Sequence, residues 1–140
     1  MTISLRISHP VQAYVRRTYQ GRFSPKAEAY HANQEALKTR LFVAMIDPPL
    51  QMFEKGVKLR LSATIARAPE KKWIYPETKK PYQRTTHPAR LADLSNFLKA
   101  VEDAANKILW HDDRQVWEYG ACSKLEDTED WFSLMVEEIE

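Results

Sequence analysis

Three aspartates in the second half of the chain are of the type that binds divalent cations. Asp93 comes just before an amphipathic segment, and Asp112 and Asp113 come just after it. Carboxylate oxygens are the hard ligands that Mg²⁺ prefers, and such an ion activates water and phosphate for hydrolysis. Each acid also has a structural interpretation: Asp93 suits a helix N-cap, and Asp112-Asp113 suits a polar turn before a strand.

The segment between these acids predicts a helix from about Asp93 to Leu109. Its expected buried stripe consists of Leu94, Phe97, Leu98, Val101, Ala105 and Ile108. A helix of about 17 residues is roughly 25 Å long. Asp93 and Asp113 should therefore lie at its opposite ends, so their spacing alone does not predict a shared site within one chain.

The remaining periodic segments predict an α+β fold. Pro25 after Ser24 begins a first helix, which the Asp47-Pro48-Pro49 segment ends. Alternation of apolar and polar residues predicts strands at 3–8, 56–69, 114–124 and 130–139, the last two antiparallel. We expect a single domain over residues 1–140, with one mixed sheet, two helices packed on it, and the order β-α-β-α-β-β.

Composition and charge narrow the class of protein. Hydrophobic residues make up 44% of the 140 residues, which excludes a disordered chain, and no apolar run approaches the roughly 20 residues of a membrane helix. With a single cysteine, Cys122, and no apolar leader, we expect a soluble, cytoplasmic protein. Residues 1–90 carry 17 Lys/Arg against 6 Asp/Glu, whereas residues 91–140 carry 4 against 13. A polyanion would be attracted to the first part.

Residues 70–90 form a basic segment without periodicity, in which Trp73, Tyr75 and Tyr82 alternate with lysines and arginines. Basic side chains bind phosphates and aromatic rings stack on unpaired bases, but a solvated loop has the same composition. The expected nucleic-acid contacts are Arg16, Arg17, Arg22, Lys71, Lys72, Lys79, Lys80, Arg84 and Arg90. The acidic C-terminal third favours a different hypothesis, an interaction module without a nucleic-acid role.

The acids fall into a longer motif. Asp93-Leu94-Ser95-Asn96, then Lys99, Asp103-Ala104 and Asp112-Asp113-Arg114-Gln115-Val116 resemble the pattern D-x-D-N-x-x-K-x-x-x-D-A followed by D-D-x-Q-V. This pattern is typical of the RusA family of Holliday-junction resolvases, small nucleases often carried by phages and prophages. The stretch Gly21–Tyr30 is also similar to the family, and the resemblance extends from about Ile3 to Trp117.

The resemblance implies a homodimeric, Mg²⁺-dependent endonuclease that resolves four-way DNA junctions in recombination and repair, with Mn²⁺ as an alternative ion. By position, the implied catalytic residues are Asp93, Asp113 and Lys99, and the implied metal ligands are Asp93 and Asp113, with Asp112 as a further acid. Lys99 would stabilise charge on the phosphate. Its structural alternative is an exposed helix lysine one turn from Asp103.

Ser95 departs from the family pattern, which has an acid at this position. A serine hydroxyl is neutral, so a site that contains it should bind Mg²⁺ more weakly. Three alternatives follow: a working enzyme with a weaker metal site, a site that uses another acid, or a relative that binds junctions or other DNA without cutting it.

Overall fold

The computed structural model describes residues 1–14, 25–68 and 93–140, with the side chains of α1 from Glu28 onward. The segment expected to be a basic loop, 70–90, and Arg16, Arg17 and Arg22 lie outside these residues. The elements in chain order are β1 (Thr2–Ile7), α1 (Pro25–Ile46), β2 (Lys58–Arg67), α2 (Leu94–Ala105), the short 3₁₀ turn η2 (Asp113–Gln115), β3 (Val116–Glu126) and β4 (Trp131–Ile139).

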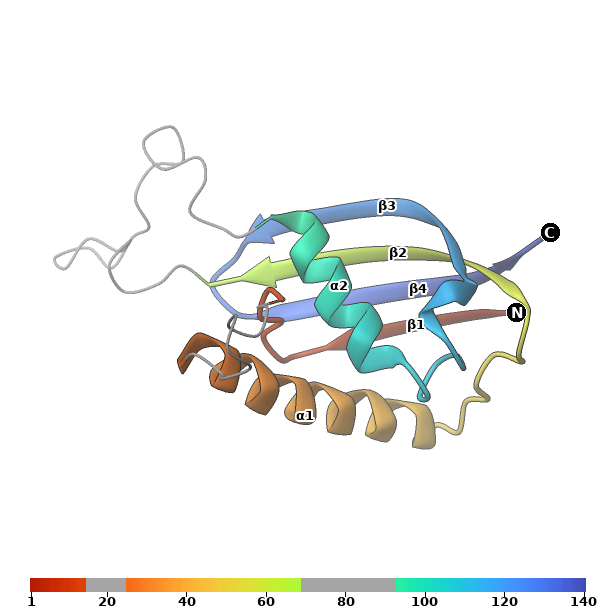
Figure 1. Ribbon diagram of the computed structural model, residues 1–140, viewed down its shortest axis with the longest axis horizontal. Coiled ribbons are helices and arrows are strands. Elements are labelled where there is room, and N and C mark those ends of the chain that lie inside the picture. The colour runs from red at the N-terminus through yellow and green to blue at the C-terminus, as the bar shows by residue number, and fades with distance from the viewer. Residues whose placement is uncertain (15–24, 69–92) are drawn as a thin grey trace, which may run out of the picture.

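The strands form one mixed sheet in the order β1-β4-β2-β3. β4 runs antiparallel to both β1 and β2, and β2 runs parallel to β3. Figure 1 shows α2 crossing the sheet and α1 along its β1 edge, both on the same side. The predicted α+β fold and element order are confirmed.

The last two strands are antiparallel in direction, as predicted, but they are not neighbours. β2 lies between them and pairs with both. The reason is the connection between β2 and β3, which includes α2. Parallel neighbours need a crossover of this kind, whereas the four residues between β3 and β4 would by themselves have favoured a hairpin.

The core lies between the sheet and the two helices. Alternate residues of β2 supply Leu59, Leu61, Ala63 and Ile65, all at most 3% exposed. α1 contributes one buried stripe at helical spacing, formed by Tyr30, Leu37, Leu41 and Met45. This arrangement fixes α2 against the sheet, with Phe97, Leu98 and Val101 buried.

α2 ends four residues earlier than the pattern predicted. Asn106 has extended backbone angles, and its side chain accepts a hydrogen bond from Trp110 Nε1 at 2.7 Å. Lys107 follows with φ of 68°, in the left-handed region. The chain therefore leaves the helix at Asn106, to which the buried Trp110 is hydrogen-bonded. Ile108 and Leu109 lie in the turn that follows.

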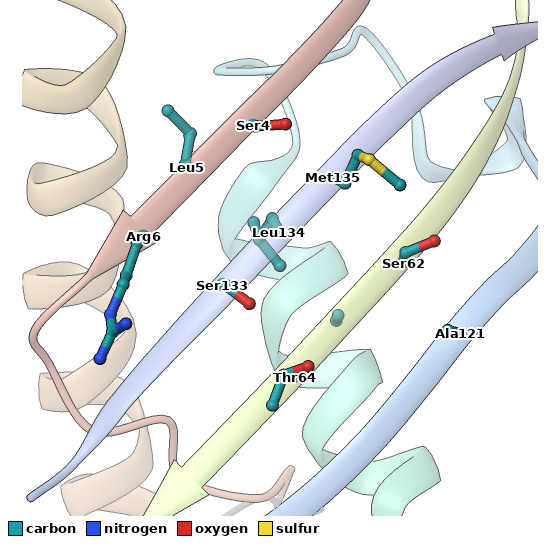
Figure 2. A pocket seen from close by; sticks show the side chains of 10 residues that line it. Ser4, Leu5, Arg6, Ser62, Thr64, Ala121, Ser133, Leu134 and Met135 are labelled. Carbon is teal, nitrogen blue, oxygen red and sulfur yellow. The ribbon is translucent and has the colours of Figure 1, made fainter.

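Among the described residues, no helix lies on the other face of the sheet. Figure 2 shows a shallow trough on this face, with small side chains such as Ser62, Ser133 and Ala121 along its floor and Arg6 and Met135 beside it. The outward basic residue of β2, Arg60, forms ion pairs with Glu118 and Glu137. The positive charge on this face of β2 is therefore partly neutralised. No helix in the described part of the chain is long and apolar enough to cross a membrane.

Candidate active site

Asp93 occupies the N-cap position of α2 without acting as a side-chain cap. Its backbone is extended, with φ −60° and ψ 140°, and its carbonyl accepts the amides of Asn96 and Phe97. Its carboxylate makes no cap hydrogen bond to the first turn of α2. The side chain is exposed, so the capping interpretation from the sequence does not account for this acid.

Ser95, Lys99 and Asp103 follow one another at intervals of one helical turn on α2. Residues four apart share a helix face, and none of the three is buried, in contrast to Phe97 and Val101 on the core side. Ser95 therefore lies one turn before Lys99 and near Asp93. An acid at position 95 would place a carboxylate beside the Lys99 ammonium.

Lys99 has a defined environment although it is exposed. Its ammonium Nζ lies 4.8 Å from the centre of the Tyr14 ring. Its positive charge also acts on Asp103, where it partly opposes the rise in pKa that burial causes in that carboxyl group. The motif lysine thus lies between an aromatic ring and an acid.

Asp113 begins η2, which follows the C-terminal end of α2 in the chain. Burial raises the pKa of Glu102 and of Asp103, and the negative charge of Asp113 raises both further. The Tyr119 hydroxyl donates a 3.0 Å hydrogen bond to Glu102, and burial together with that carboxylate raises the pKa of Tyr119 to about 12. Asp113 thus lies close enough to Glu102 and Asp103 for its negative charge to raise the pKa of both.

Asp112 is engaged in local structure. Its carboxylate accepts the Arg114 amide at 2.9 Å, which caps η2, and it forms an ion pair with the Arg114 guanidinium at 2.9 Å. The hydrogen bonds from Arg114 hold the pKa of Asp112 well below its usual range. Asp112 therefore serves the turn, as its structural interpretation predicted, and this engagement competes with metal binding.

Gln115, the glutamine of the motif, makes four side-chain hydrogen bonds. It is 7% exposed, and its Oε1 accepts the amides of His111 and Asp112, while its Nε2 donates to the carbonyls of Glu54 and Val57. These four hydrogen bonds tie the turn before β3 to the segment before β2. Reasoning from the sequence gave Gln115 no role, although its place in the motif was a signal.

The structure does not bring Asp93 and Asp113 together within one chain. They flank the 12 residues of α2, which at the usual helical rise span roughly 18 Å. Ligands of one Mg²⁺ all lie about 2 Å from the ion. The described residues contain no group of three or more His, Cys, Asp or Glu arranged to hold a metal ion. The donors are suitable, but the described residues of one chain do not assemble them into one metal site.

Comparison with known families identifies the motif. Residues 8–131 match the family described as Endodeoxyribonuclease RusA. The chain belongs to the RusA family. Its members are endodeoxyribonucleases that act on Holliday junctions, so the resemblance seen in the sequence is confirmed. No curated protein matches the chain.

The RusA match includes α1, β2, α2 and β3, and therefore both ends of the motif. It also includes the basic residues expected to contact DNA, from Arg16 to Arg90, which lie outside the described residues. Their roles stay predictions, as do the catalytic roles of Asp93, Asp113 and Lys99.

Proposed function

We propose that this chain is a Holliday-junction endonuclease that hydrolyses phosphodiester bonds with Mg²⁺ or Mn²⁺ in DNA recombination and repair. Membership of the RusA family supports the substrate class and the type of reaction. In this proposal Asp93 and Asp113 are metal ligands and Lys99 acts on the scissile phosphate. Asp112 is retained only as an auxiliary acid, because Arg114 already neutralises it.

The observation that carries the proposal is the state of Asp93. A residue retained only as an N-cap would be expected to bond its side chain to the amides of the first turn. Asp93 has the backbone of a cap but leaves its carboxylate exposed and without that bond. An exposed carboxylate that makes no cap bond, in the motif of a nuclease family, favours a role in cation binding.

The position of Lys99 also favours the N-terminal part of α2 as the place where the phosphate would react. It lies one turn beyond Ser95 on the same face, and an ammonium group stabilises negative charge as it develops on a phosphate. Mg²⁺, when bound, would polarise that phosphate. The basic residues 16–17, 22 and 71–90 would hold the junction arms through their phosphates.

We further propose a homodimer, as the family resemblance implied. Asp93 precedes α2 and Asp113 follows it, so a second copy that brings its Asp113 end to the Asp93 end of the first would let both acids bind one ion. Two such sites related by a two-fold axis would match the symmetry of a four-way junction and give paired cuts.

A second candidate function is junction binding without cleavage. Ser95 favours it, because the family acid that would stand one turn from Lys99 is absent. The basic first 90 residues would still bind DNA in this case. The two functions therefore differ only in the chemical step.

Incubation with a synthetic four-way junction and Mg²⁺ or Mn²⁺, at protein excess, tests the proposal. We expect symmetric nicks with the parent chain, and more rapid nicking with Ser95→Asp. Binding at low salt without nicking, converted to nicking by Ser95→Asp, would establish the second candidate. Failure to bind the junction at low salt would remove both, and linear duplex DNA of equal length is the control substrate.

A further inference from the structure

The environment of Lys99 contains an aromatic residue outside the motif. Tyr14 follows β1, and its backbone amide donates a 3.1 Å hydrogen bond to the carbonyl of Asn96 on α2. This bond fixes Tyr14 beside the first turn of the helix. Its ring then lies 4.8 Å from the Lys99 ammonium, centre to Nζ.

The Tyr14 ring is itself supported from α1. Tyr30 contacts it edge to face, with ring centres 5.7 Å apart and an interplanar angle of 88°. Tyr30 is only 4% exposed, so it is held by the core. Three segments that are distant in sequence therefore converge on Lys99, and the ring that the lysine contacts is not a freely moving surface group.

Lys99 has two partners, the Asp103 carboxylate and the Tyr14 ring. Asp103 lies one turn toward the C-terminus of α2 and attracts the ammonium. Tyr14 is anchored at Asn96, three residues toward the N-terminus. A lysine that precedes its acid by four residues has the weaker orientation for a helix ion pair. The ring can therefore hold the ammonium on the side of Asp93 and Ser95.

We propose that Tyr14 is a positioning residue for Lys99, holding its ammonium over the tyrosine ring and toward the Asp93–Ser95 end of α2. The contact itself is independent of any reaction. Its consequence, a lysine aimed at the scissile phosphate, rests on the proposed nuclease function. A cation over an aromatic face is stabilised whether the ring is tyrosine or phenylalanine, which gives a matched pair of variants, Tyr14→Phe and Tyr14→Leu.

Nuclear magnetic resonance on the full chain with ¹³C-labelled lysine tests the contact directly. Lys99→Arg assigns the Lys99 signal by its loss, and Lys58, whose Nζ lies 4.3 Å from the Trp117 ring centre, is a positive reference. We expect the Lys99 Cε protons to be shifted upfield, with nuclear Overhauser contacts to the Tyr14 ring. The shift should persist in Tyr14→Phe and disappear in Tyr14→Leu.

In the parent chain, an unshifted Lys99 Cε proton signal without Overhauser contacts to the Tyr14 ring would overturn the proposal. An upfield shift that persists in folded Tyr14→Leu would also overturn it. If Tyr14→Leu does not fold, the contacts in the parent and Tyr14→Phe decide. In junction cleavage, Tyr14→Leu should lower kcat roughly two- to tenfold with KM unchanged, and Tyr14→Phe should match the parent. Equal losses in both variants would also contradict it. A parent that does not cut removes the nuclease function but leaves the spectroscopic result to judge the contact.

Discussion

Asp93 and Asp112 each precede a helical turn, yet their side chains are in different states. Asp112 caps η2 with its carboxylate, pairs with Arg114 and completes a reciprocal capping box with Gln115. Asp93 precedes the longer helix, α2, and makes no side-chain cap. The same residue type in the same local position is therefore engaged in one case and exposed in the other.

The difference separates an acid that stabilises a turn, Asp112, from an exposed acid that makes no side-chain cap, Asp93. The pair Asp112-Asp113 looked equivalent in the sequence, but the Arg114 guanidinium forms its ion pair with Asp112. Asp113 instead adds negative charge beside Glu102 and Asp103. We therefore assign the proposed metal-binding role to Asp93 and Asp113 and the structural role to Asp112.

The largest expected effect is the loss of nicking in Asp113→Asn and in Asp93→Asn. Each change removes a charged ligand while leaving the core intact, and we expect a loss on the order of a hundredfold in junction cleavage. If the site is shared between two copies, mixing the two inactive variants restores one intact site in each mixed dimer. Nicking that stays absent after mixing, with mixed dimers demonstrated, would argue against a shared site.

Gln115→Ala should cause the largest loss of stability in this region. The change leaves two part-buried amides of the turn and the carbonyls of Glu54 and Val57 without these four hydrogen bonds, which we expect to cost roughly 2 to 4 kcal/mol. Urea unfolding measures it. Asn96→Ala, also in the motif but with hydrogen bonds seen only through its backbone in the described residues, is the matched control and should change the free energy of unfolding far less.

Asp112 and Glu102 should give opposite dependences of stability on pH. The pKa of Asp112 is lowered by Arg114, so its contribution is present above its unfolded pKa and is lost as the pH falls. The pKa of Glu102 is raised by burial, so the fold favours its protonated form and stability declines as the pH rises above about 4.5. Glu102→Gln should flatten that decline, and Asp112→Asn should flatten the acid-side loss. Thermal unfolding from about pH 2 to pH 8 measures both, and the same slope in both variants would contradict the assignment.

Much of the fold could be predicted because periodicity reports burial. The stripe Tyr30, Leu37, Leu41 and Met45 and the alternation in β2 both face the core. The strand order could not be predicted from local pattern, because the pairing of β2 with β3 depends on how α2 crosses the sheet. The early end of α2 was missed because it depends on a tertiary contact, the hydrogen bond from the buried Trp110 to Asn106.

The residue types of the candidate site could be predicted, but their states could not. The motif gave Asp93, Lys99 and Asp113, and spacing already indicated that the two acids lie at opposite ends of α2. Whether a carboxylate caps a turn depends on its rotamer and neighbours, which the sequence does not contain. Tyr14 had no sequence signal, because the contact with Lys99 joins segments about 85 residues apart that only the packing of α2 brings together.

Mn²⁺ binding by the matched variants Asp93→Asn and Asp112→Asn tests the central assignment most directly. Calorimetric titration in the presence of four-way junction DNA measures it without requiring cleavage, so the result does not depend on Ser95. We expect Asp112→Asn to bind Mn²⁺ nearly as the parent does, and Asp93→Asn to lose roughly tenfold or more in affinity. Unchanged affinity in Asp93→Asn, or the larger loss in a folded Asp112→Asn, would contradict the account.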